Sequence, residues 1–435
     1  MNTTRPAAIP AEPNREDWLY ILASAAVLSS LVIAILGMPD LLTVGPRRFS
    51  LLLLSLPLIL GAGLVAFRRR FCDIRPGLVD ATLLAAMAYL MLRNVRLLSI
   101  EYAFYGIGLF YLSSLAVQQQ RFLKAIIFTF ASLAAIASLL GGVELLFLPD
   151  NLASLYISNP DPVNVFHRIG STLLHPVVFA AFLVMSLPLC VYLGIFGSTR
   201  KARTLGYSSS ALSLVALLFT FSKGGWLVMF LMACVLGLSL LKYRDWPKVL
   251  LGAGLIVLIL LPVFLMWQPV SQQTMTRLKT SFRSRAITGE FALRAAEQYP
   301  IFGIGLRMGP SALTGFDPRI RKFNETHDNP MPIDDFYISY FLEEGLVGLS
   351  PFLLFLILLL LRGARSIFGK AANRALLIAV FASFVGIALD AFTFEIFSWW
   401  SIYICFWMLA GMLYGLSGPA VARLPYFVVK KPDSI

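Results

Sequence analysis

The sequence predicts an all-α membrane protein that crosses the bilayer about twelve times, and three observations support this fold class. Of the 435 residues, 58% are hydrophobic and only 14% are charged, whereas roughly a quarter of the residues in a soluble domain carry a charge. The mean hydropathy is +0.78. Apolar runs of span length recur along the chain, and about 20 apolar residues are needed for one helix to cross the hydrocarbon layer.

Apolar runs bounded by polar, proline or glycine residues define the expected spans. The third, seventh and eighth runs are short or broken, so the count could differ by one or two. The first run follows a polar stretch and lacks a small-residue cleavage site, so we expect an anchor and not a signal peptide. The expected spans are 18–37, 50–67, 78–92, 100–117, 122–148, 171–196, 207–221, 225–241, 249–267, 336–361, 373–392 and 397–416.

The distribution of basic residues orients these spans. With the amino terminus in the cytoplasm, most lysines and arginines fall in alternate loops and at the two termini, which the positive-inside rule places in the cytoplasm. Nine of the remaining basic residues lie in one long hydrophilic segment on the opposite side. The sequence therefore divides into spans 1–9 within residues 1–267, a large periplasmic loop with interfacial helices at 268–335, and spans 10–12 with a cytoplasmic tail at 336–435.

Several function classes lose support from the sequence. The four cysteines contain no CxxC pair, so neither a disulfide framework nor a zinc site is expected. The chain has no GxxxxGKS/T phosphate loop and no GxSxG elbow, which disfavours ATP-driven transport and serine hydrolysis. The net charge of +13 could attract nucleic acid, an anionic membrane or an anionic substrate. Because its cations lie in membrane loops, we expect a bilayer and an anionic substrate, without nucleic acid.

Basic residues on the outer side are candidates for binding a phosphate or diphosphate. Arg168 opens the sixth run, Lys223 lies in FSKGGW between two short runs, and the long loop carries Arg283, Arg285 and Arg294. Guanidinium groups bind phosphate oxygens through paired, charge-assisted hydrogen bonds. The alternatives are contact with anionic lipid headgroups for the loop residues, a snorkelling side chain for Arg168 and an intraprotein anion for Lys223.

Acids and a histidine gather in NETHDNPMPIDDFYISYFLEEGLVG, at 324–348. A carboxylate or imidazole in this stretch could accept a proton from an attacking hydroxyl, so Asp334 and His327 are the catalytic candidates. No metal-binding spacing accompanies them, and we expect neither a metal nor a cofactor. Alternatively, Asp334 is a helix N-cap with Asp335 in the first turn, and His327 is an ordinary loop histidine. His175, in the sixth run, could hydrogen-bond backbone groups freed by the following proline.

Several of these features resemble one known family in their order and spacing. They are a dozen helices, SKGGW between two short central spans, a large outer loop after the ninth span, a basic helix followed by PIFGIGL, and LEEGLVGL. This arrangement resembles the O-antigen ligase and O-antigen polymerase superfamily from about Arg168 to Leu349, while the first five spans match in number only. The resemblance implies a GT-C-like membrane glycosyltransferase.

The resemblance also implies roles for three cations. Lys223 stands where the family usually has an arginine, and Arg285 lies near the arginine that precedes the run ending in PIFGIGL. Arg168 lies in a stretch that resembles the family's Arg-x-x-Gly at the start of the sixth span. In that family all three would contact the diphosphate of an undecaprenyl-linked glycan.

One position departs from the family pattern. Counted back from Glu343-x-Gly345, the family's histidine-asparagine pair falls on Asp334 and Asp335, so the histidine proposed as the base of the ligase is missing here. Asp334 takes its role, or His327 does, or the chain does not perform the lipid A core ligase reaction. An aspartate at this position is more similar to the polymerase or exopolysaccharide branch.

We therefore expect an inverting, metal-independent glycosyltransferase in the bacterial inner membrane. It would move a glycan from an undecaprenyl-diphosphate carrier to a glycan or lipid A core acceptor at the periplasmic face. The alternative is a lipid-linked glycan flippase or secondary transporter, a class that typically carries inverted repeats and charges near the midplane. We find no repeat between the halves, and charges inside the spans are few, Glu144 and Asp390 among them. A non-catalytic assembly scaffold is a second alternative.

Overall fold

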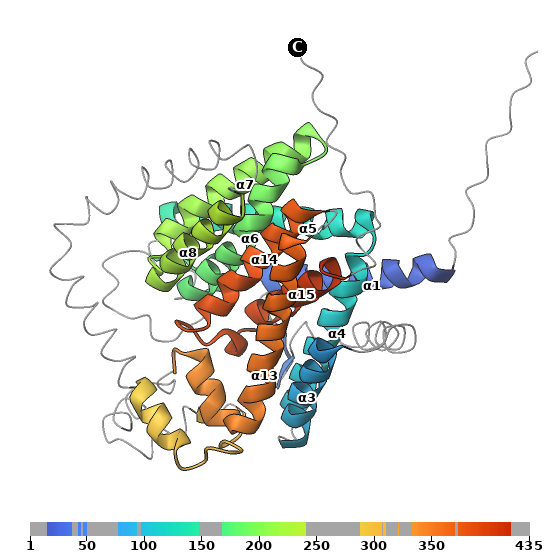
Figure 1. Cartoon of the computed structure of the whole chain (residues 1–435). Helices are drawn as coiled ribbons and strands as arrows, with labels where there is room; N and C mark the ends of the chain where they lie inside the picture. Colours follow the sequence, from blue (N-terminus) through green and yellow to red (C-terminus); the bar gives the residue numbers. More distant parts are fainter. Residues whose placement is uncertain are drawn as a thin grey trace, which may run out of the picture.

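The computed structural model describes residues 15–36, 42–44, 47–49, 77–93, 97–147, 168–240, 288–306, 308–309, 321, 333–369 and 373–418. Within these residues the chain is almost entirely helical (Figure 1). Its helices are α1 (Arg15–Leu36), α3 (Leu78–Arg93), α4 (Leu97–Ala116), α5 (Gln120–Phe147), α6 (Pro176–Phe196), α7 (Arg200–Phe219), α8 (Lys223–Leu240), α13 (Phe336–Phe368), α14 (Arg374–Asp390) and α15 (Trp400–Leu416).

Shorter elements complete the described chain. The 3-10 turns η2 (Ser171–Leu173) and η3 (Ile396–Ser398) precede α6 and α15, and residues 288–296 are helical. Strands β1 (Leu42–Val44) and β2 (Arg47–Phe49) form an antiparallel hairpin in which Leu42 pairs with Phe49.

The expected spans that fall in the described residues all form helices, which confirms the helical fold class. The largest differences lie in the sixth, seventh and tenth spans. Helix α6 begins at Pro176 and not at residue 171, α7 begins at Arg200 and not at residue 207, and α13 continues to Phe368 instead of ending at residue 361. Proline is favoured in the first turn of a helix, where its missing N–H has no helical partner, and this fits the later start of α6. The expected spans 50–67 and 249–267 lie outside the described residues.

Three described helices are long and apolar enough to cross a membrane: α5, α6 and α13. Shorter apolar helices cover Tyr20–Leu36, Lys223–Ala233 and Trp400–Leu416. These helices are consistent with a multi-pass membrane protein. The number of twelve spans and the placement of the long loop remain predictions.

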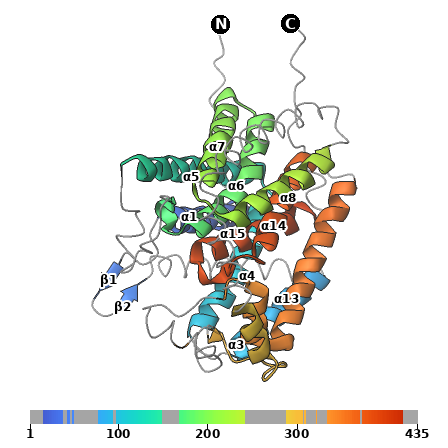
Figure 2. The same ribbon diagram turned by 90° about the vertical axis from the view of Figure 1, so that its left-hand side faces the viewer.

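Helix α6 lies at the centre of the bundle and packs against α5, α7, α8 and α14. Its crossing with α7 is unusually close, since a Cβ on Gly206 would lie 2.2 Å from the backbone nitrogen of Gly194. Small residues allow membrane helices to approach in this way. A second group joins α4 to α1, α3 and α15, and α13 runs beside α3 (Figure 2).

Hydrogen bonds tie the start of α3 to neighbouring helices. The buried carboxylate of Asp80 accepts hydrogen bonds from the hydroxyls of Tyr111 and Tyr414, at 3.0 and 2.6 Å. The guanidinium of Arg362 in α13 lies 4.1 Å from the centre of the Tyr414 ring. These contacts fix α3, α4, α13 and α15 together near the start of α3. The candidate site lies elsewhere, at the opposite ends of α13 and α15.

Candidate functional site

The candidate site is built where the chain enters α6, α8 and α13. Arg168 precedes η2, and its Nε donates a hydrogen bond of 2.9 Å to the backbone oxygen of Thr220, in the turn between α7 and α8. The backbone nitrogen of Ile169 donates to the oxygen of Phe219 in the same turn, at 3.2 Å. Arg168 therefore lies beside the turn that leads to Lys223.

A buried carboxylate supports this entry segment. Glu144 in α5 is 1% exposed, and its Oε2 accepts hydrogen bonds from the backbone nitrogens of Gly170 and Ser171, at 3.1 and 2.7 Å. The Ser171 hydroxyl donates to the oxygen of Ala137 in α5, at 2.6 Å. The charge that the sequence places inside the fifth span thus holds the backbone next to Arg168.

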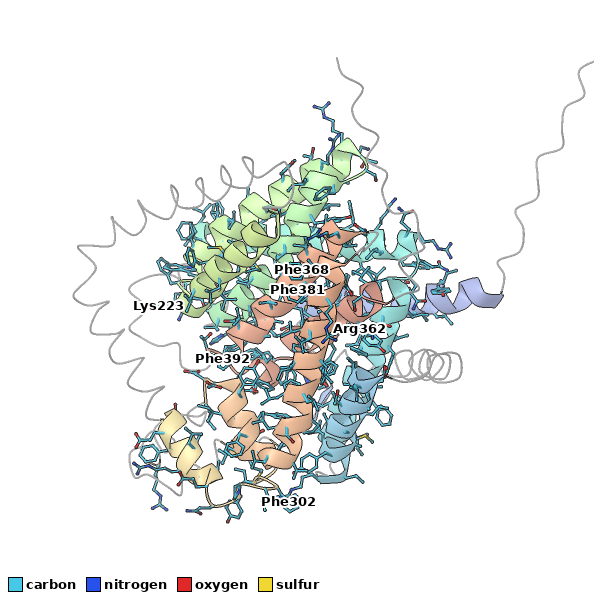
Figure 3. The ribbon with its side chains drawn as sticks, in the orientation of Figure 1. Lys223, Phe302, Arg362, Phe368, Phe381 and Phe392 are labelled. Carbon is cyan, nitrogen blue, oxygen red and sulfur yellow. The ribbon has the colours of Figure 1, made fainter. Side chains whose placement is uncertain are left out.

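Lys223 begins α8 and is exposed. The next residue, Gly224, packs directly on the turn after α14, because a Cβ at Gly224 would lie 2.4 Å from the Thr393 hydroxyl oxygen. That hydroxyl donates to Oδ1 of Asp390, at 2.9 Å. Lys223 and Phe392 lie on the same side of the molecule (Figure 3). The start of α8 and the end of α14 therefore share one surface.

The start of α13 reaches the same turn. The backbone nitrogen of Phe336 donates to the oxygen of Ala391, at 2.9 Å, and the Tyr337 hydroxyl donates to the oxygen of Ala388, at 2.9 Å. The aspartate pair that precedes Phe336 is consequently placed near the turn that contacts Gly224. Arg168, Lys223 and Asp334 thus lie at one end of the bundle, where side-chain and backbone contacts connect the segments that carry them.

The N-cap alternative for the two aspartates was wrong by one residue. Asp335, not Asp334, is the N-cap of α13, and its Oδ1 accepts a hydrogen bond of 3.1 Å from the backbone nitrogen of Ile338. Burial raises the pKa of the Asp335 carboxyl, which precedes the first residue of α13, while backbone hydrogen bonds act in the opposite direction. Asp334 is partly exposed and directly precedes the cap.

The two motifs PIFGIGL and LEEGLVGL pack against each other, which the sequence did not reveal. Helix α13 is interrupted at Gly345, where φ is 65° and ψ is −170°. On one side of the break, the nitrogens of Ile304 and Gly305 donate to the oxygens of Leu342 and Glu343, at 3.0 and 2.8 Å. On the other side, the nitrogens of residues 346 and 347 donate to the oxygens of residues 300 and 301. The second motif therefore supplies the backbone partners of the first.

Two side chains from α3 bind this motif pair. The Tyr89 hydroxyl lies 2.9 Å from the backbone oxygen of Glu344 and 3.0 Å from that of Phe302. Arg93 donates from Nε to the oxygen of Phe302, at 3.3 Å, and from Nη2 to that of Gly303, at 3.2 Å. Sequence reasoning missed both residues. A tyrosine and an arginine spaced i, i+4 at the end of an expected span were the available signal.

The helix at 288–296 packs on the start of α13 through its alanines. Ala292, Ala295 and Ala296 form a small apolar cluster with Ile333 and Leu342. Arg294 lies on the exposed side of this helix. Its Nη2 is 2.5 Å from Oε1 of Glu290, and both side chains are more than half exposed.

The other predicted site residues lie apart from this group or outside the described residues. No described contact brings Arg294 to Arg168 or Lys223. His327, Arg283 and Arg285 lie outside the described residues. In the part of the chain that the structure describes, no three His, Cys, Asp or Glu side chains are grouped as metal ligands would be.

The described helices, three of them long and apolar enough to cross a bilayer, support the class of multi-pass helical membrane proteins. A family model described as O-antigen ligase matches residues 208–353, a range that includes Lys223, Asp334 and both interlocked motifs. The match supports assignment of the chain to the O-antigen ligase and polymerase superfamily, as the motifs predicted. This family implies an enzyme of the ligase or polymerase type that transfers glycans from lipid-linked substrates. Comparison with curated proteins gives no match.

Proposed function

We propose that this protein is an inverting, metal-independent glycosyltransferase of the bacterial inner membrane. It moves a glycan from an undecaprenyl-diphosphate carrier to an acceptor hydroxyl at the periplasmic face, as an O-antigen ligase or as an O-antigen or exopolysaccharide polymerase. The observation that carries the proposal is the placement of Arg168, Lys223 and Asp334 at one end of the bundle. Residues 208–353, which match the ligase family, contain two of these three residues.

In the proposed reaction, the cations stabilise the leaving group. As the bond between the anomeric carbon and the phosphate oxygen breaks, its electron pair passes to the diphosphate, where negative charge accumulates. Arg168 and Lys223, together with Arg285 and Arg283 of the long loop, neutralise this charge. Arg294 adds to the positive potential from the surface, and its pairing with Glu290 makes its contribution the smallest.

Asp334 is the preferred proton acceptor of the two adjacent aspartates. Oδ1 of Asp335 is already engaged by the backbone nitrogen of Ile338 at the helix start. Asp334 takes the proton of the acceptor hydroxyl while the hydroxyl oxygen bonds to the anomeric carbon, and a single displacement inverts that centre. His327 is the alternative base. The donor supplies the energy, so the reaction needs no nucleotide.

Reconstitution tests the proposed reaction directly. The purified protein is placed in liposomes with an undecaprenyl-diphosphate-linked oligosaccharide and an acceptor glycan, in EDTA and without an ion gradient. We expect glycan transfer, which Lys223→Ala and Arg285→Ala should reduce strongly. Movement of the donor between leaflets without transfer would instead support the flippase alternative. A scaffold would give neither activity. In that case a variant that combines Lys223→Ala with Arg285→Ala would keep the cellular phenotype of the wild type.

The product that accumulates in a deletion strain distinguishes the two reaction types. Asp334 and Asp335 in place of the family's histidine and asparagine favour the polymerase branch. On this branch, mass spectrometry should find a single unextended repeat on the lipid carrier. A long chain that remains unattached to its acceptor would identify a ligase.

A further inference from the structure

The segment between Arg168 and α6 contains a histidine that the proposed reaction has not used. His175 is the N-cap residue of α6, but its side chain makes no capping hydrogen bond. The structure therefore does not support the alternative that His175 binds backbone groups freed by the proline. Its Nδ1 is buried and has no hydrogen-bond partner.

The imidazole has a fixed orientation. Its ring stacks on the indole of Trp399, with 5.1 Å between the ring centres and 30° between the planes. Trp399 is itself the N-cap residue of α15, so the stack joins the starts of two helices. With Nδ1 enclosed, Nε2 is the nitrogen that remains for a ligand, and the residue as a whole is partly exposed.

The backbone around His175 is held in a costly conformation. In the part of the chain that the structure describes, three residues other than glycine have a positive φ: Ser171 at 52°, Leu174 at 60° and Phe221 at 49°. Two lie between Arg168 and His175, and the third lies two residues before Lys223. Such strain costs free energy and tends to persist at functional sites. The strained positions therefore lie within three residues of Arg168, His175 or Lys223 in the sequence.

The charge state of His175 suits a neutral donor. The residue lies just before the first residue of α6, and burial together with the positive charge of Arg168 lowers the pKa of its imidazole to about 4. A neutral imidazole carries one N–H and one lone pair. The tautomer with its lone pair on the enclosed Nδ1 carries the N–H on Nε2, where it can be donated to an oxygen.

We propose that Nε2 of His175 donates a hydrogen bond to a phosphoryl oxygen of the bound polyprenyl diphosphate, beside Arg168. This inference rests on the proposed function and adds a substrate-binding residue to its site. An arginine next to the imidazole favours an anionic ligand at this position, and the Trp399 stack keeps the donor aimed in one direction.

Three substitutions separate hydrogen bonding from ring packing. The amide nitrogen of His175→Gln reaches the place of Nε2, that of His175→Asn reaches the place of Nδ1, and His175→Phe keeps only the ring on Trp399. The probe is undecaprenyl diphosphate without a glycan, bound to the protein in nanodiscs and quantified by native mass spectrometry. Phosphatidylglycerol and undecaprenyl monophosphate serve as comparison lipids.

We expect His175→Gln to bind undecaprenyl diphosphate within about threefold of wild type, and His175→Asn and His175→Phe about tenfold or more weakly, the loss expected for one hydrogen bond to a charged group. If His175→Phe bound undecaprenyl diphosphate as tightly as wild type, or more tightly than His175→Gln, His175 would be only a packing residue and the proposal would be overturned. An equal dependence of phosphatidylglycerol binding on His175 would also overturn it, in favour of a general headgroup site.

Binding is measured without turnover, so the two proposals fail separately. If His175→Gln binds the diphosphate more tightly than His175→Asn and His175→Phe but no donor gives transfer, the binding role of His175 stands and the proposed function fails. If transfer occurs and all three variants bind the diphosphate as wild type does, only the role of His175 fails. Thermal midpoints of the variants confirm that each is folded before binding is compared.

Discussion

Gly303 and Gly345 meet backbone to backbone at the break in α13. A Cβ added to Gly345 would lie 2.6 Å from the nitrogen of Gly303 and 2.4 Å from the oxygen of Ile301. Both glycines have positive φ, 68° and 65°. PIFGIGL and LEEGLVGL, about forty residues apart in the sequence, are thus joined at a point where neither segment has room for a side chain.

Replacing Gly345 should therefore destabilise the protein. Gly345→Ala forces an alanine into a backbone conformation that essentially only glycine adopts (φ 65°, ψ −170°), at a cost of about 1–3 kcal/mol, and the clash with Ile301 adds to that loss. We expect a lower thermal midpoint in detergent. Gly142→Ala is the matched control, because Gly142 is helical and has no neighbouring atom within 4 Å of an added Cβ. An unchanged midpoint for Gly345→Ala would contradict the described interlock.

Removing Glu144 should affect both folding and the Arg168 segment. Glu144→Ala leaves the nitrogens of Gly170 and Ser171 without their acceptor, at a cost of about 1–3 kcal/mol for each unsatisfied group. Glu144→Gln keeps one oxygen and should be milder. Donor affinity should fall together with the thermal midpoint, since the strained segment next to Arg168 loses its support.

An exposed acid provides the control for this prediction. Glu290 pairs with Arg294 at the surface, and Glu290→Ala should change stability by no more than about 1 kcal/mol. If Glu144→Ala and Glu290→Ala had equal effects on the thermal midpoint, Glu144 would not support the segment as described.

The carboxyl-terminal end of α3 should stabilise the motif pair. Tyr89→Phe removes only the hydroxyl that reaches Glu344 and Phe302, and should lower stability by about 0.5–1.5 kcal/mol. Tyr207→Phe is a suitable control, because Tyr207 is 58% exposed. Hydrogen exchange of residues 300–306 should rise in the Tyr89 variant and stay unchanged in the control. Equal exchange in both would show that α3 does not hold these residues.

Hydropathy predicted the described helices because each must bury its backbone polar groups within one apolar segment. Lys223 and the aspartate pair were predicted near helix starts, and they lie there. The motif interlock could not be predicted, because it consists of backbone hydrogen bonds that side-chain patterns do not encode. Tyr89 and Arg93 were missed because their partners are more than 200 residues away. The sequence placed the N-cap on Asp334 and not on Asp335, because a one-residue shift of the helix start leaves the hydrophobic pattern almost unchanged.

The two adjacent aspartates should have separate roles, Asp335 in stability and Asp334 in glycan transfer. Asp335→Asn preserves an N-cap, since asparagine and aspartate cap helices about equally well, whereas Asp335→Ala should cost about 0.5–2 kcal/mol. Asp334→Asn should leave the thermal midpoint unchanged and abolish glycan transfer, because the amide cannot take the hydroxyl proton.

The pKa of Asp335 adds a pH test. Because its folded-state pKa is raised, the folded protein binds the proton more tightly than the unfolded chain. Asp335 therefore contributes stability at low pH that is lost as pH rises from its unfolded pKa, about 3.9, through the folded value. Asp335→Asn removes this dependence, so wild type should lose stability relative to the variant as the pH rises over that range.

Glycan transfer that survives in Asp334→Asn would contradict the role of Asp334 as the base and would move that role to His327.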